Sequence, residues 1–232
     1  MKSQKRHIIL DTETTGLKPE QGHKLIEICG MEVIDGVKTG EVFHKFINPE
    51  RDVPYEAFAI HGISTEFLLD KEIFANIAQD FVEFIKDATL VIHNARFDVG
   101  FLNYELKKLG HPTIVLDEVV DTLAMARKKF PGSPASLDAL CKRFKINLSK
   151  RDKHGALIDV ELLYEVYRHL TDDHLLIKTN SQDKEEAITN YIDIEKNDKI
   201  FRPAREYNCS PEELAAHAEF IKKNIKEPIW NI

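Results

Sequence analysis

The stretch HIILDTETTGL, residues 7–17, joins a short apolar run to a group of polar residues. Ile8 to Leu10 have the character of a buried strand, and Asp11 and Glu13 follow at once. Side chains two residues apart on a strand point to the same face, so the two carboxylates are expected to lie side by side. Charge at the end of a buried strand is costly, and two like charges also repel each other. The stretch therefore indicates that something positive lies between the two acids.

Composition sets broad limits. The 232 residues are 43% hydrophobic, which is enough for one substantial core plus an appendage. The formal net charge of −7 argues against a protein that coats nucleic acid, but not against an enzyme that meets it through a bound metal or a partner. Cys29, Cys141 and Cys209 form no CxxC pair and are expected to be reduced thiols. With no signal peptide and no apolar run near the ~20 residues that span a bilayer, the sequence predicts a cytoplasmic protein without membrane contact.

Periodicity and turn signals predict strands first, and then strands alternating with helices. Asp35-Gly36 lies between two strand-like runs in residues 24–49 and is a strong hairpin signal. Residues 54–70 are expected to be irregular. Further strands are predicted at 7–12, 89–94 and 114–117, and helices at 72–87, 97–110, near 121–129, within 131–144 and at 154–170. This order indicates an α/β layered domain over residues 1–172.

The C-terminal part has a different character. Residues 173–206 are rich in charged and polar side chains and are predicted to form a linker. The segment 207–232 then begins a helix with the capping box Ser210-Pro211-Glu212-Glu213. A single short helix cannot bury its own apolar face, so it either packs back on the domain or docks on another protein. The nearby Trp230 favours docking, because aromatic anchors dominate interfaces.

Three more candidate groups follow the first two acids. Asp98 lies just past a predicted strand at the start of a helix, and His154 precedes Asp159 by five residues. Each acid alone also fits an ordinary role: Asp11 as a turn residue, Asp98 in the first turn of a helix, Asp159 on a solvated helix face. Asp159, however, has the apolar neighbours Ile158 and Val160, and three ordinary roles would require three coincidences.

Four carboxylates without a histidine or cysteine cluster suit a hard cation, Mg²⁺ or Mn²⁺, rather than zinc. Four acids can hold two such ions, and two ions about 4 Å apart can clamp a scissile phosphate. With Gly155 behind it, His154 is expected on a loop before the last helix, from which it can reach the site. Its unperturbed pKa near 6.5 suits a general base at neutral pH.

These segments resemble the three motifs of the DEDDh-type 3′–5′ exonucleases: DTETTG, HNARFD and H-x-x-x-x-D, in that order, within residues 7 to about 170. The stretches FAIHGISTEFLLDK (58–71) and EELAAHAEFIKKN (212–224), with the terminal tryptophan, are similar to the proofreading epsilon subunits of bacterial DNA polymerase III. The resemblance implies a ribonuclease-H-like mixed sheet flanked by helices, followed by a linker and a docking helix.

The resemblance also implies roles for individual residues. Asp11, Glu13, Asp98 and Asp159 would bind the two metals, and His154 would be the base. The residues expected to contact a single-stranded or frayed DNA 3′ end are Asp11, Glu13, Thr15, Leu17, His61, Asn94, Phe97, His154 and Asp159.

The same resemblance implies partners. The C-terminal segment would bind the polymerase alpha subunit, and in some lineages a small theta subunit joins. Gln182 is followed by DKEEA, which departs from the sliding-clamp motif that some family members carry, so clamp binding has little support.

Three functions fit the sequence. The first is a proofreading subunit that hydrolyses the terminal phosphodiester of a mismatched 3′ end. The second is a free-standing DEDDh exonuclease that acts on RNA or short oligonucleotides, for which the linker and capped helix would have no purpose. The third is a non-catalytic binding module on the same fold, against which the complete set of four acids and a histidine argues.

Overall fold

The computed structural model of the chain describes residues 5–148 and 154–171, together with the single positions 210, 215, 219 and 223. The chain divides into two units, Met1–Ile177 and Lys178–Ile232. The predicted linker and docking segment, 173–206 and 207–232, lie outside the described residues apart from those single positions. The helices and strands named here all belong to the first unit.

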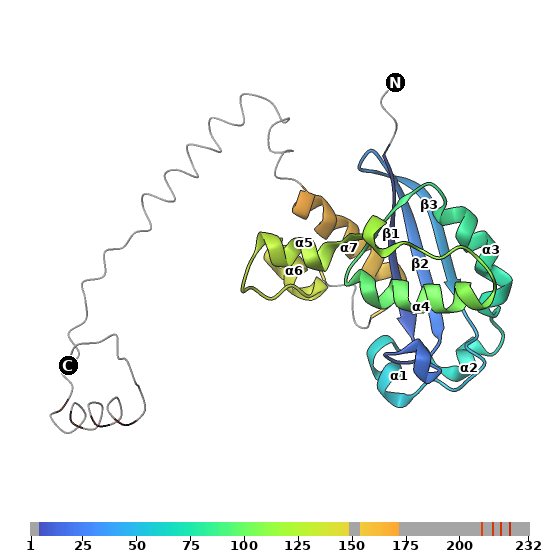
Figure 1. The fold of residues 1–232 in the computed structure, drawn as a ribbon, viewed down its shortest axis with the longest axis horizontal. Coiled ribbons are helices and arrows are strands. Elements are labelled where there is room, and N and C mark those ends of the chain that lie inside the picture. The colour runs from blue at the N-terminus through green and yellow to red at the C-terminus, as the bar shows by residue number, and fades with distance from the viewer. Residues whose placement is uncertain are drawn as a thin grey trace. The chain divides into compact units, whose positions relative to one another are not determined.

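A five-stranded sheet forms the centre of this unit, in the order β3-β2-β1-β4-β5 (Figure 1). The strands are β1 (Arg6–Thr14), β2 (Leu25–Ile34), β3 (Val37–Phe46), β4 (Thr89–Ile92) and β5 (Val120–Asp121). β1 is antiparallel to β2 and parallel to β4, so the sheet is mixed and β1 is its central strand. The first stretch of the sequence therefore lies in the middle of the fold.

The β2–β3 connection is the predicted hairpin. Asp35 and Gly36 both adopt positive φ, at 49° and 85°. Positive φ at both central residues is the requirement of the type I′ turn, whose twist matches that of the flanking strands. The Asp-Gly signal is confirmed.

Helices cover both faces of the sheet (Figure 1). The longer ones are α3 (Phe74–Ile85), α4 (Ala95–Lys108), α5 (Thr122–Lys129), α6 (Leu137–Arg143) and α7 (Ala156–Thr171). Two short helices, α1 (Tyr55–His61) and α2 (Thr65–Leu68), and two 3₁₀ turns, η1 (Pro19–Gln21) and η2 (Leu116–Glu118), lie in the connections. Among the described helices, none has the length and apolar character that crossing a bilayer requires.

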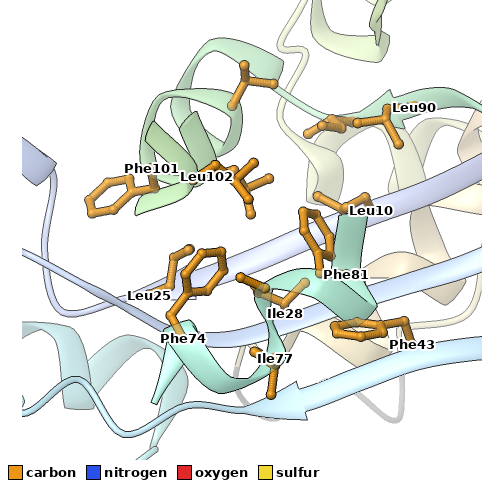
Figure 2. Close-up of a cluster of buried hydrophobic side chains, with 14 of the residues drawn as sticks. Leu10, Leu25, Ile28, Phe43, Phe74, Ile77, Phe81, Leu90, Phe101 and Leu102 are labelled. Atoms are coloured by element: carbon orange, nitrogen blue, oxygen red, sulfur yellow. The ribbon is translucent and has the colours of Figure 1, made fainter. Parts of the chain in front are cut away.

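Each face of β1 belongs to a different core. Ile8 and Leu10 pack with Phe81 of α3 and Leu102 of α4 (Figure 2). Ile9 packs instead with the α5–α7 side of the sheet. Side chains alternate along a strand, so Thr12 continues the face of Ile8 and Leu10. Asp11 and Glu13 continue the face of Ile9. The end of β1 thus lies between the α4 layer and the α7 layer.

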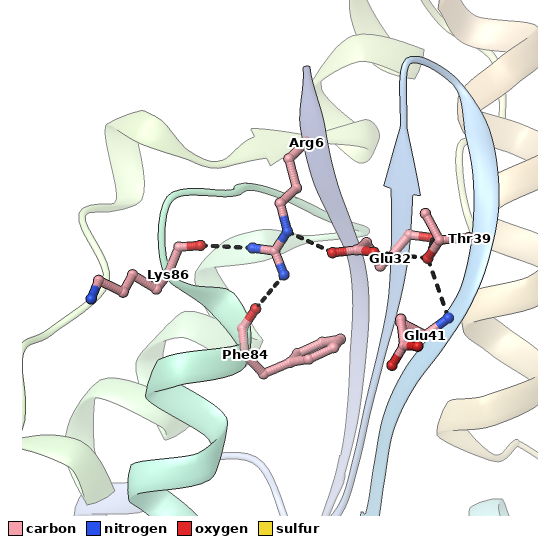
Figure 3. A network of polar contacts seen from close by, with 6 residues as sticks. All are labelled: Arg6, Glu32, Thr39, Glu41, Phe84 and Lys86. Carbon is pink, nitrogen blue, oxygen red and sulfur yellow. Dashed lines mark hydrogen bonds and ion pairs between the residues drawn. The ribbon is translucent and has the colours of Figure 1, made fainter. Parts of the chain in front are cut away.

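The opposite end of β1 is fixed by Arg6 (Figure 3). Its Nε lies 2.6 Å from Glu32 Oε1 on β2, and its two terminal nitrogens donate to the carbonyl oxygens of Phe84 and Lys86 at 2.8 and 2.6 Å. The hydrogen bond from Arg6 lowers the pKa of Glu32. One guanidinium therefore ties β1, β2 and the end of α3 together.

Two local predictions are wrong. Residues 54–70 are not irregular, because they form α1 and α2; α2 begins where Ser64 Oγ accepts the Phe67 N–H at 3.2 Å. The strand predicted at 114–117 does not form. The backbone N–H and C=O of Ile114 are both bound by the side chain of Asn103, at 2.7 and 2.8 Å. That side chain takes the place of a strand partner, and β5 begins only at Val120.

Candidate active site

Carboxylates gather where β1 ends. Asp11 and Glu13 are on one face of the strand, Asp98 is in the first turn of α4, and Asp159 is in the first turn of α7. Burial raises the pKa of Asp11 well above its usual value, and the charges of Asp98, Asp159 and Glu13 raise it further. The charges of the other three acids therefore act on Asp11, and all four belong to one electrostatic environment.

Asp98 is held by the central strand. It is 3% exposed, and Thr12 Oγ1 donates a hydrogen bond to its Oδ1 at 2.7 Å. Burial raises the pKa of Asp98 to about 7, although the hydrogen bonds from Thr12 act in the opposite direction. The turn before α4 is also fixed, because the Asn94 N–H donates to Asp121 Oδ1 at 3.1 Å.

His154 and Asp159 form the other side of the site. His154 lies just before α7, as predicted, and its Nδ1 is 3.3 Å from Asp159 Oδ2. Its backbone N–H donates to the carbonyl oxygen of Ile60 at 3.2 Å, which links the segment to α1. Asp159 is buried, whereas His154 is exposed at the surface of the site. The imidazole is thus oriented by a carboxylate and accessible from solvent.

These residues fit a divalent cation. Glu13, His154 and Asp159 each offer a ligand atom, and those atoms all lie within 4.8 Å of one another. Carboxylate oxygens are the ligands that Mg²⁺ and Mn²⁺ prefer. The raised pKa values of Asp11 and Asp98 also point to a bound cation, because an ion of opposite sign stabilises the charged form of acids that repel one another.

Three of the predicted substrate-binding residues line one pocket. Leu17, Asn94 and Phe97 surround a cavity of about 470 Å³ between η1 and α4, together with Lys18 and Arg96. Leu17 is 78% exposed, so a large apolar side chain is available to a ligand there. Leu17 and Asn94, which are 77 positions apart in the chain, are therefore brought together at this cavity.

Thr15 and His61, the other two residues predicted to bind substrate alone, do not line this cavity. Thr15 is 1% exposed, and its hydroxyl accepts the Lys24 N–H at 2.9 Å. His61 is 6% exposed, and its Nδ1 accepts the Ile63 N–H at 3.0 Å. Thr15 thus holds the segment that follows β1, and His61 holds the turn that follows α1. Direct contact with substrate stays a prediction for each.

Glu27 of β2 is a buried acid near the site that was not among the predicted residues. This acid is 3% exposed and lies opposite Glu13 in the register of β1 and β2. It stands between Ile26 and Ile28 in an apolar run, which is the same signal that singled out Asp159.

The whole chain has relatives among known proteins. Residues 8–167 match the family model described as Exonuclease. DNA polymerase III subunit epsilon of Rickettsia conorii is 50% identical over 224 residues, covering 95% of this chain and 97% of the relative. The Escherichia coli K12 protein of the same name is 43% identical, with 97% of each chain covered. The solved nuclease domain of 3′hExo, a DEDDh family member, is 15% identical with a TM-score of 0.63, covers 75% of this chain and 94% of that domain, and shares its fold.

Proposed function

We propose that this chain, which belongs to the exonuclease family and within it to the epsilon subunits of DNA polymerase III, proofreads DNA. It would do so by removing mismatched 3′-terminal nucleotides. The observation that carries the proposal is the convergence of Asp11, Glu13, Asp98, Asp159 and His154 at one end of β1. Enzymes of this family depend on metal ions. We propose that the cofactor is a pair of divalent cations, either Mg²⁺ or Mn²⁺.

The residues divide the work of hydrolysis. The four carboxylates would hold the cations, which would neutralise the phosphate and acidify the attacking water. His154 accepts a proton from that water through Nε2, while its Nδ1 faces Asp159 Oδ2 at 3.3 Å. A new P–O bond forms with the water oxygen, the bond from phosphorus to the 3′ oxygen of the preceding nucleotide breaks, and that oxygen takes up a proton from solvent to become the new 3′-hydroxyl. The products are a deoxynucleoside 5′-monophosphate and a DNA strand shortened by one nucleotide.

Selection of mismatched ends follows from the pocket between η1 and α4. Leu17 and Phe97 offer apolar contact to the terminal base, and Asn94 offers hydrogen bonds to it. A base can enter only after it has left its partner, and unpairing costs least at a mismatch. The active site would therefore cut frayed ends faster than paired ones without reading the base itself.

We assign the partners by the same proposal. The chain is part of the DNA polymerase III complex and binds DNA 3′ ends. Residues 207–232 would dock on the alpha subunit, and the linker 173–206 would keep the nuclease at a high effective concentration near the primer end. A theta-like subunit is a further candidate, and binding of the clamp through Gln182 is not part of the proposal.

The test combines excision and binding. Release of the terminal nucleotide should be faster from a mismatched than from a paired DNA 3′ end, and faster than from RNA of the same sequence, for which the protein would need contacts to the 2′-hydroxyl. A pull-down with purified alpha subunit should retain the full chain and lose a variant that ends at residue 206. Equal cleavage of RNA, together with no binding of the full chain to the alpha subunit, would favour a free-standing nuclease instead. Alpha binding that survives the truncation would contradict the docking role of residues 207–232.

A further inference from the structure

Glu27 is a buried acid that the proposed chemistry does not use. It lies on β2 at the position paired with Glu13 of β1, and its neighbours along the strand are apolar. Glu27 is 3% exposed, and a buried carboxylate is costly unless its oxygens have hydrogen-bond partners. Both of its oxygens have one.

The first partner is the start of α7. The N–H of Ala156 donates to Glu27 Oε2 at 3.1 Å, in a buried bond between residues 129 positions apart. Ala156 is the first residue of α7, and the first N–H groups of a helix have no acceptor within the helix. A carboxylate at this end also meets the positive pole of the helix dipole.

The second partner is His44 on β3. Its Nε2 lies 2.7 Å from Glu27 Oε1. His44 thus holds one oxygen of Glu27, so that the other points at α7. The result is a chain of contacts from β3 through β2 to the first amide of α7.

The contact with Ala156 lies between the two functional residues of this segment. His154 precedes Ala156 by two positions, and Asp159 follows it by three, with its N–H donating to Gly155 at 3.0 Å. Holding the Ala156 amide therefore fixes the start of α7, on which the positions of both side chains depend. The sheet, which carries Asp11 and Glu13, and the helix, which carries Asp159, are joined at this point.

We propose that Glu27, oriented by His44, is a positioning residue that holds the start of α7 in register with β1 and so sets the geometry of the metal site. The inference rests on the proposed function. Glu27 acts through α7 rather than as a ligand, because its two oxygens are engaged by Ala156 and His44. Residues that orient metal ligands in this way typically change metal affinity or activity by about 10–100-fold when they are replaced.

The experiment is a calorimetric titration of the full chain with Mn²⁺, alongside steady-state excision of a 3′-mismatched primer. Glu27→Ala is expected to weaken Mn²⁺ binding by about 10–100-fold and to lower kcat while KM for the primer is unchanged. Glu27→Gln keeps an oxygen for the Ala156 N–H and should retain most of the affinity. His44→Ala should have a smaller effect than Glu27→Ala.

Glu32→Gln is the matched control, because it neutralises a second acid of the same strand, one that is partly buried and paired with Arg6. Glu32 bonds Arg6 at the far end of β1, so the variant should melt at a lower temperature yet bind Mn²⁺ like the wild type. Should Glu27→Ala not fold, Glu27→Asp replaces it, since the acid that is one methylene shorter no longer reaches the amide.

Unchanged Mn²⁺ affinity in a folded Glu27→Ala or Glu27→Asp variant would overturn the positioning role, even if the variant melted early. Failure of the wild type itself to bind Mn²⁺ would overturn the proposed function, and the two failures are therefore distinguishable.

Discussion

Asp98 should make the metal-free protein less stable as the pH rises. Burial raises its pKa from 3.8 to about 7 in the folded state, so folding favours the protonated acid. The sign follows directly: the stability contribution is complete below pH 3.8 and is lost as the pH rises towards 7. Asp98→Asn, a nearly isosteric neutral variant, removes this loss.

The size of the effect follows from the same two pKa values. A difference of about three units corresponds to about 4 kcal/mol between the fully protonated and fully ionised limits. Between pH 5 and pH 8, the stability of Asp98→Asn relative to the wild type should rise by about 2–3 kcal/mol. Only the difference between the two proteins is used, so that titration of the acids distant from Asp98 cancels.

The assay is urea denaturation followed by circular dichroism at pH 5 and pH 8, with a chelator present. Added Mg²⁺ at pH 8 should stabilise the wild type more than Asp98→Asn, because the cation compensates a charge that the variant lacks. A relative stability that does not change between the two pH values would refute the argument that Asp98 is ionised at a cost in the folded protein.

Three further predictions concern individual side chains. His154→Gln should lower kcat by about 10²–10⁴-fold, the usual range for loss of a general base, with KM for DNA unchanged in steady-state excision assays. Arg96→Ala should weaken binding of single-stranded DNA and reduce the slope of log affinity against log salt by about 0.7, as expected for one lost phosphate contact. Thr12→Val removes a hydrogen bond to ionised Asp98 and should weaken Mn²⁺ binding about tenfold in calorimetric titrations. An unchanged kcat in His154→Gln would contradict its role as the base. An unchanged salt slope in Arg96→Ala would contradict a phosphate contact, and unchanged Mn²⁺ affinity in Thr12→Val would contradict the support of Asp98.

The sequence predicted the parts of the fold that depend on local patterns. Asp35-Gly36 specifies its turn through backbone preference alone, and the apolar face of residues 72–87 forms α3, with Ile77 and Phe81 buried. The segment 114–117 has the pattern of a strand but does not form one, because its conformation depends on Asn103, a side chain on another element. No local pattern contains that information.

The candidate site shows the same division. The acids are recognisable because a charged residue is rare among apolar neighbours in the sequence. Glu27 in LIEICG carries the same signal, although it was not among the predicted site residues. What the signal could not supply is the partner of each acid. Thr12, which donates to Asp98, and Ala156, which donates to Glu27, come from distant segments of the chain. The Thr15 hydroxyl likewise meets the Lys24 N–H only in the folded chain, whereas the contact of His61 with the Ile63 N–H is local.

The most direct test of the central claim is release of the 3′-terminal nucleotide from a mismatched DNA primer, measured against Mg²⁺ and Mn²⁺ concentration for the wild type and Asp11→Asn. The wild type should be inactive with chelator and gain activity with either cation. Asp11→Asn should stay folded, bind the cations more weakly and release almost no nucleotide. Activity of the wild type in chelator, or full metal-dependent activity of Asp11→Asn, would contradict a site built on these carboxylates.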